Sequence, residues 1–137
     1  MDTIIEKFIS VYQGLDSNNI SSIASIYDKN IKFVDPFHEV NGLETLMGYF
    51  SRLYRNVESC DFEFKEIYKS NSSAMVTWNM LLKHKSLSKH PIDVPGSTEI
   101  HFNEKIHYHR DYFDAGKMLY ENVPLIGSAV RFLKKKV

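Results

Sequence analysis

Apolar residues in the first part of the chain recur every three or four positions, which is the spacing of a helix with one buried face. This pattern predicts helices over residues 2–15, 19–28 and 42–55. The turn-forming stretches DSNN and DKN interrupt it after the first and second of these helices. Before the third helix, IKFVDPF is typical of a short strand that stops at Pro36, because proline cannot donate a hydrogen bond to a neighbouring strand.

From residue 60 onward the apolar residues alternate, as they do on a strand with one buried face. The alternation predicts four strands, at 60–69, 73–84, 92–102 and 104–114. The short polar stretches SNSS and NE separate some of these runs, which favours antiparallel connections. After Gly116 the helical spacing returns and predicts a helical tail over about 117–137.

Helices followed by an antiparallel meander indicate an α+β fold in a single domain spanning residues 1–137. We expect the three N-terminal helices to pack on one face of a strongly curved antiparallel sheet and to enclose a pocket there. The chain is long enough for an ordinary core, since 43% of its residues are hydrophobic.

The charge balance narrows the classes of partner. Seventeen basic residues face 17 acidic ones, so no overall field attracts nucleic acid. Cys60 is the only cysteine, and the start MDTIIEKFIS lacks the order of a signal peptide, so we expect a cytoplasmic protein. No phosphate-binding glycine loop and no paired cysteine motif occurs, and we expect no cofactor.

One short stretch, EKIHYHRDYFDAG, gathers two histidines, an arginine and two aspartates among aromatic residues. Alternation divides its strand into two faces, one with His107, His109, Asp111 and Phe113, the other with Tyr108, Arg110, Tyr112 and Asp114. If the first face lines the interior, an imidazole and a carboxylate lie side by side and could move protons near neutral pH. Arg110 and Tyr112 then face outward. The alternative is a set of ion pairs at a sheet edge or a subunit interface.

The pair His107 and His109 also has the spacing of two metal ligands on one side of a strand, as in cupins. Cupins are almost entirely β, however, and the three leading helices predicted here have no place in that fold. We therefore predict no metal site.

Two stretches, residues 23–50 (IASIYDKNIKFVDPFHEVNGLETLMGYF) and 106–118 (IHYHRDYFDAGKM), resemble a superfamily of cone-shaped α+β proteins. It includes nuclear transport factor two, ketosteroid isomerase, limonene epoxide hydrolase and the SnoaL polyketide cyclases, and the SnoaL-like branch is the most similar. The resemblance implies a ligand site inside the cone. It also implies a homodimer, because sheets of this superfamily commonly pair back to back.

The resemblance also suggests roles for particular residues. In SnoaL-type cyclases the acid/base is an aspartate late in the last strand, which corresponds to Asp111, with His109 beside it to tune or relay the proton. Asp35 lies where ketosteroid isomerases carry their general base and is a second candidate. The oxyanion-hole residues of those isomerases are not matched, because Val11 and Thr98 occupy the corresponding positions and Tyr12 is one place away.

Five residues are candidates for contact with a ligand: Trp78, Met80, His84, His38 and Tyr12. Trp78 and Met80 alternate on one face of a central strand, so they belong to the core first and to a pocket wall second. His84 continues that face toward the rim. His38 follows Asp35 in a loop near the mouth of the cone, although loop histidines are more often solvated or partners in a turn.

These observations favour a small enzyme that uses general acid/base chemistry on an apolar, oxygen-bearing small molecule, as an isomerase, cyclase or hydrolase. The alternative is a non-catalytic module that binds a hydrophobic ligand or acts through dimerisation. The basic ending RFLKKKV is typical of a solvated helix end, and contact with an anionic membrane is the alternative for that segment.

Overall fold

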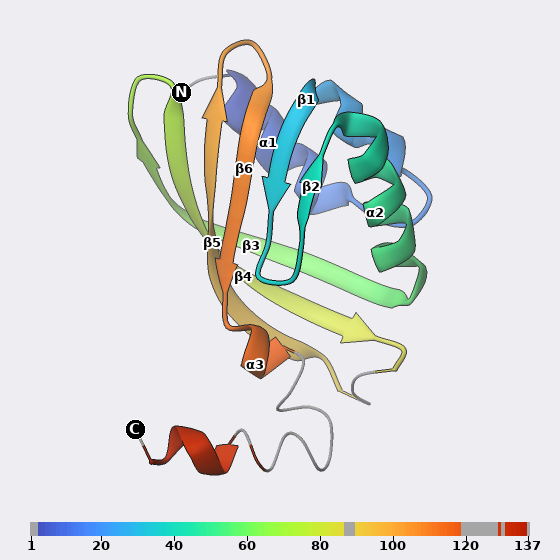
Figure 1. The fold of residues 1–137 in the computed structure, drawn as a ribbon, viewed down its shortest axis with the longest axis vertical. Helices are drawn as coiled ribbons and strands as arrows, with labels where there is room; N and C mark the ends of the chain where they lie inside the picture. Colours follow the sequence, from blue (N-terminus) through green and yellow to red (C-terminus); the bar gives the residue numbers. More distant parts are fainter. Residues whose placement is uncertain (1–2, 87–89, 119–128, 130, 137) are drawn as a thin grey trace.

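The computed structural model describes residues 3–86, 90–118, 129 and 131–136 (Figure 1). Its elements follow in the order α1 (Thr3–Gly14), a 3-10 helix η1 (Ile20–Ser25), β1 (Tyr27–Val34), β2 (Glu39–Asn41), α2 (Leu43–Arg55), β3 (Val57–Lys69), β4 (Ser73–His84), β5 (Ile92–Phe102), β6 (Ile106–Phe113) and α3 (Ala115–Met118). Helices come first and a meander of strands follows, as predicted.

The six strands form one curled sheet in the order β2-β1-β6-β5-β4-β3. Figure 1 shows α1 and α2 on the same side of it, where α1 contacts β3 and α2 contacts β1. The predicted α+β architecture with a strongly curved sheet is confirmed. Neighbouring strands are antiparallel except β1 and β6, which run parallel. The sheet is therefore mixed, because β1 comes from the N-terminal part of the chain and joins the meander beside its last strand.

The predicted second helix is largely wrong. Residues 20–25 form a 3-10 helix, and the strand predicted to begin at Ile31 begins at Tyr27 instead. Ile20, Ile23 and Ile26 are all buried, a spacing of three that suits the 3-10 helix as well as the α-helix. The backbone of Ile106 in β6 bonds to the carbonyl of Ile26, so pairing with a distant strand overrides the local helical pattern.

The short strand β2 was not predicted, because three residues are too few to show a period. The buried faces of the long strands agree better with the sequence. Along β4 every second residue from Ala74 to Leu82 is buried. Ala74 belongs to a large apolar cluster beneath the helices, and Trp78, Met80 and Leu82 belong to a smaller one that also contains Ile92 and Val94.

Most of the predicted helical tail at 117–137 lies outside the described residues. Within them, α3 ends at Met118, and residues 131–134 are helical. No helix in the described part of the chain is both long and apolar enough to cross a bilayer.

Candidate functional site

The centre of the candidate site is the pair His109 and Asp111 on β6. This strand lies between β1 and β5, so its inward side chains sit in the middle of the sheet. The imidazole of His109 is 1% exposed, and its Nε2 lies 2.7 Å from Oδ1 of Asp111. The ring stacks on Phe33 at a centroid distance of 4.4 Å. The predicted contact between the imidazole and the carboxylate inside the fold is confirmed.

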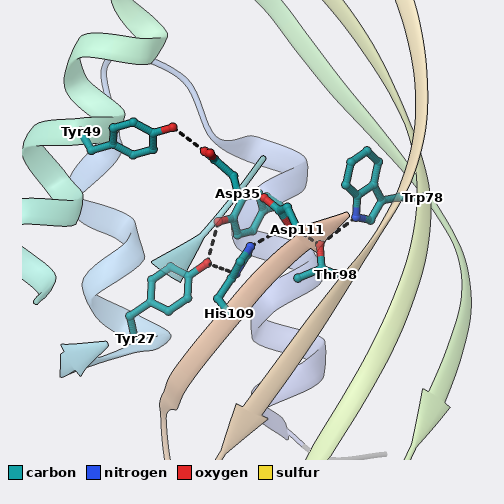
Figure 2. Close-up of polar contacts among 8 residues, drawn as sticks. Tyr27, Asp35, Tyr49, Trp78, Thr98, His109 and Asp111 are labelled. Atoms are coloured by element: carbon teal, nitrogen blue, oxygen red, sulfur yellow. Dashed lines mark hydrogen bonds and ion pairs between the residues drawn. The ribbon is translucent and has the colours of Figure 1, made fainter. Parts of the chain in front are cut away.

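Two buried tyrosines extend this pair on its imidazole side. The hydroxyl of Tyr27 lies 2.7 Å from Nδ1 of His109 (Figure 2). The hydroxyl of Tyr12 lies 2.6 Å from that of Tyr27. Burial raises the pKa of both tyrosines well above the ordinary value, so both keep their hydroxyl hydrogens. The predicted ligand residue Tyr12 thus belongs to an internal hydrogen-bond chain. Tyr27 was not foreseen, because it was assigned to a helix.

A second series of hydrogen bonds, from Trp78 through Thr98, reaches Asp111 from the neighbouring strands. The indole Nε1 of Trp78 donates to Oγ1 of Thr98 at 2.8 Å, and the Thr98 hydroxyl donates to Oδ1 of Asp111 at 2.7 Å (Figure 2). Thr98 is 2% exposed. Trp78 is buried beside the carboxylate, as predicted. The sequence analysis named Thr98 only because it occupies an oxyanion-hole position of the isomerases, and it did not predict the contact with Asp111.

The outer side of β6 carries the remaining polar residues of the motif. The guanidinium of Arg110 lies 5.3 Å from the centre of the Tyr112 ring, and the Tyr112 hydroxyl donates to Glu99 at 3.1 Å. Hydrogen bonds from His101 and Tyr112 lower the pKa of Glu99. The predicted outward orientation of Arg110 and Tyr112 is confirmed.

His107 does not share the inward face with His109, contrary to the simple alternation. In β5 the neighbours His101 and Phe102 pair with Tyr108 and Ile106, so His107 is an extra residue in β6. Such a bulge shifts the alternation by one position. His107 is exposed, whereas His109 is buried, and the two do not form a ligand pair. Among the described residues no group of three or more histidine, cysteine, aspartate or glutamate side chains could hold a metal ion.

Asp35 is part of a second polar group, in the loop between β1 and β2. Its Oδ1 accepts the backbone N–H groups of Phe37 and His38 at 2.8 Å each, and its Oδ2 accepts the Tyr49 hydroxyl (Figure 2). Nδ1 of His38 lies 3.2 Å from the same hydroxyl. Burial, followed by the bond to Asp35, raises the pKa of Tyr49. Both carboxylate oxygens of Asp35 therefore hold the loop, and its role as a general base stays a prediction.

The other predicted ligand residues lie apart from the pair. Met80 is buried in the smaller apolar cluster with Trp78. His84 ends β4 and accepts the backbone N–H of Ser86 at 3.1 Å. It is six positions beyond Trp78, roughly 20 Å along an extended strand. Burial lowers the pKa of His84. Its placement favours a role in the turn.

Asp111 combines a firmly held carboxylate oxygen with an open one. Oδ1 contacts both Thr98 and His109, whereas no hydrogen bond from a described residue reaches Oδ2. The side chain is 18% exposed. Phe113 follows on the same strand, with ring centroids 6.3 Å from Trp78 and 6.0 Å from Phe37. The arrangement can present a carboxylate oxygen to a small molecule at an aromatic surface.

Two hollows in the described surface lie elsewhere. One is lined by residues at the start of α1 and at the turn after β5, and the other lies beside the β3–β4 turn and includes Tyr68 and His101. Asp111 borders neither. The predicted pocket at the carboxylate therefore stays a prediction.

Comparison with known proteins agrees with this architecture. The SnoaL-like domain family matches residues 8–109. A hypothetical protein with a ketosteroid isomerase-like fold from Catenulispora acidiphila, solved with trimethylamine, is 17% identical over 85% of this chain and 89% of its own, with a TM-score of 0.74. A candidate SnoaL-like polyketide cyclase from Shewanella putrefaciens is 17% identical over 86% and 94%, with a TM-score of 0.71.

A third similar structure is TerC, co-crystallised with polyporic acid. It is 13% identical over 85% of this chain and 95% of its own, with a TM-score of 0.73. At these identities the likeness establishes the cone-shaped fold that the resemblance implied. A search among curated proteins found no significant match.

Proposed function

The chain belongs to the SnoaL-like domain family, and we propose that it is an enzyme that moves a proton on an apolar, oxygen-bearing small molecule. The observation that carries this proposal is Asp111, whose Oδ1 is held by Thr98 and His109 while Oδ2 is open. A carboxylate with one fixed and one open oxygen is suited to take a proton from a bound molecule and return it elsewhere.

The proposed reaction is an isomerisation or cyclisation that begins next to a carbonyl group. Oδ2 of Asp111 accepts a proton from the carbon beside the carbonyl, and the electron pair of that C–H bond moves into the enolate. The same carboxyl then returns the proton to carbon or oxygen of the product. His109 stabilises the ionised carboxylate by a hydrogen bond at Oδ1.

The surroundings of Asp111 support an apolar, partly aromatic substrate. Phe113, two positions from Asp111 on β6, is half-buried, and its ring contacts the half-buried ring of Phe37 and the buried indole of Trp78. Aromatic faces bind flat apolar molecules well. The similar structure crystallised with polyporic acid, and the one described as a candidate polyketide cyclase, support the same class of ligand.

The test is deuterium exchange into 2-tetralone, an apolar ketone with acidic C–H bonds beside its carbonyl. The wild-type protein in D2O should accelerate exchange, measured by mass spectrometry, and Asp111→Asn should abolish the acceleration while melting at a similar temperature. Asp35→Asn replaces the second candidate base, and if Asp111 is the base, as proposed, this variant should retain the acceleration. No acceleration by the wild type, or loss of acceleration only in Asp35→Asn, would contradict the proposal.

The second candidate function is ligand binding without catalysis. It is favoured by the continuous hydrogen-bond chain from Tyr12 to Trp78, in which the buried polar side chains are already bonded to one another. A carboxylate beside aromatic rings also suits an alkylammonium ligand, as in the similar structure that contains trimethylamine. Quenching of Trp78 fluorescence by trimethylammonium, together with no exchange in 2-tetralone, would favour this function over the enzyme.

We also propose that the protein forms a homodimer through the outer face of its sheet. Tyr68, Leu81 and Tyr112 are 63%, 46% and 43% exposed, and the strand pairings place them on one face. Light scattering at micromolar concentration should show a dimer, and Leu81→Asp should shift it toward the monomer. Leu53→Asp changes a leucine of similar exposure on α2 and should leave the dimer intact. A wild-type monomer would contradict the proposal.

A further inference from the structure

We propose that Thr98 and Trp78 are positioning residues that determine which oxygen of Asp111 exchanges protons. The inference rests on the proposed function of Asp111 and adds the residues that act through it. In this arrangement Oδ1 is a permanent hydrogen-bond acceptor, and Oδ2 is the oxygen that gains and loses the proton.

The direction of the hydrogen bonds follows from the chemistry of the indole. A tryptophan Nε1–H can only donate, so the Thr98 hydroxyl oxygen accepts it. The hydroxyl hydrogen of Thr98 is then directed at Oδ1 of Asp111, 2.7 Å away. Oδ1 receives this hydrogen whether the carboxyl group is ionised or neutral. A proton bound by Asp111 must therefore reside on Oδ2.

The imidazole reinforces the same assignment. Nε2 of His109 lies 2.7 Å from the same oxygen, and a nitrogen facing a carboxylate oxygen carries the hydrogen. In the tautomer with its hydrogen on Nε2, Nδ1 accepts the hydroxyl hydrogen of Tyr27. The Thr98 hydroxyl and the His109 imidazole thus both donate to Oδ1. They orient the carboxyl group so that Oδ2 points away from both donors.

The backbone of β5 leaves space for the Trp78 indole, which begins this series of hydrogen bonds. Gly96 pairs with Trp78 across the sheet and Thr98 pairs with Asp111, so two alternate positions of β5 connect β4 to β6. A Cβ atom at Gly96 would lie 2.5 Å from Cη2 of the indole. The absence of a side chain at position 96 gives the indole the space from which its N–H reaches Thr98.

Several titratable groups face Asp111 from the elements packed around it. Those that act on it by contact or by charge are His109 on β6, Tyr27 on β1, Tyr12 on α1 and Tyr49 and Tyr54 on α2, with Asp35 acting through Tyr49. Burial raises the pKa of all four tyrosines, so they stay neutral through the acid range. Asp35 is the other carboxylate of this group, so its asparagine variant serves as the control for Asp111.

The sequence contains a single tryptophan, so the protein's indole fluorescence reports on Trp78 alone. Ionisation of Asp111 should alter that fluorescence through the Thr98 hydroxyl. Thr98→Val removes the hydroxyl at nearly constant size and takes one donor from the carboxylate. The fluorescence midpoint should therefore move to higher pH by about one unit, the effect of losing a typical hydrogen bond. Thr98→Ser keeps the hydroxyl and should restore the wild-type midpoint.

Asp111→Asn should abolish the pH-dependent change in Trp78 fluorescence, and Asp35→Asn should leave this transition in place. A transition that persists in Asp111→Asn, an unshifted midpoint in Thr98→Val, or a wild-type fluorescence that does not change with pH would each overturn the inference. If Thr98→Val fails to fold, Thr98→Ala removes the same hydroxyl with a smaller side chain and should shift the midpoint in the same direction.

The titration requires no substrate, so it separates this inference from the proposed function. A shifted midpoint without deuterium exchange into 2-tetralone would contradict the enzyme and support the positioning role. Exchange that depends on Asp111 and keeps the same pH profile in Thr98→Val would support the enzyme and overturn the positioning role. Where both hold, Thr98→Val should lower the exchange rate about tenfold at a pH below the wild-type midpoint, and Thr98→Ser should recover it.

Discussion

The hydroxyl of Tyr27 lies 2.7 Å from Nδ1 of His109, although 82 positions separate the two residues in the sequence. The contact exists because β1 and β6, from opposite ends of the fold, run side by side and parallel. Both side chains are almost completely buried. The first strand of the protein therefore supplies the hydrogen-bond partner that fixes the imidazole of the last strand.

Replacement of Tyr27 by phenylalanine should lower the free energy of unfolding by about 1–3 kcal/mol, because it leaves the buried Nδ1 of His109 without a donor. Urea denaturation measures the change. Tyr68→Phe is the control, since Tyr68 is 63% exposed and its change should stay within about 0.5 kcal/mol. Equal effects of the two substitutions would show that the Tyr27 hydroxyl is not an important partner.

Gly96→Ala should destabilise the fold by about 1–3 kcal/mol, because the added Cβ would lie 2.5 Å from the Trp78 indole and 2.8 Å from the carbonyl oxygen of Tyr112. Near-ultraviolet circular dichroism should show a displaced indole. Gly48→Ala is the matched control in the interior of α2, where the nearest atom is 3.6 Å away. That substitution should stabilise the helix by roughly 0.5–1 kcal/mol. A neutral Gly96→Ala would contradict the close approach.

The thiol of Cys60 should be unreactive in the folded protein. Burial raises the pKa of this thiol to about 12, and its hydrogen bond with Tyr54 only partly opposes the shift. At pH 8 the folded protein should react with a thiol reagent on the order of a thousandfold more slowly than the chain in concentrated urea. Similar rates in the two conditions would show that the thiol is accessible and ionisable.

Stability should fall at alkaline pH. Burial raises the pKa of Tyr12, Tyr27 and Tyr54 well above the ordinary value of 10.0. A group whose pKa is higher in the folded state stabilises the fold fully below its unfolded pKa and progressively less above it. Unfolding free energy should therefore decline as the pH rises beyond about 10. Tyrosinate absorbance should appear together with the loss of circular dichroism, and ionisation of these tyrosines without unfolding would contradict the prediction.

The regular strands were the most predictable elements because their burial is periodic. The alternation that placed Trp78 and Met80 on the inner face of β4 reflects a strand buried on one side, and the structure agrees. The same reasoning paired His109 with Asp111, two positions apart on β6. It failed for His107, because a bulge adds one residue to β6, and a bulge leaves no trace in the pattern of apolar letters.

The segment around Tyr27 shows how tertiary pairing can override a local pattern. Three isoleucines at spacing three indicated an α-helix that continues through Tyr27. In the fold the helix is a short 3-10 segment and Tyr27 begins a strand, because Ile106 offers backbone partners there. Ile106 is 79 positions beyond Tyr27 in the sequence, so no local window contains both.

The α+β order could be predicted from the amino-acid pattern, and so could the division of each long strand into two faces, with His109 and Asp111 on the same one, because each depends on spacing within one segment. That this face points inward followed only from the family resemblance. The surroundings of these two residues depend on the tertiary structure. Three sets of contacts join residues from different elements: the Tyr27 hydroxyl with His109, the hydrogen bonds from Trp78 through Thr98 to Asp111, and the bond of the Asp35 loop with Tyr49. Periodicity specifies which way a side chain faces, whereas its hydrogen-bond partner depends on which strands become neighbours when the sheet curls.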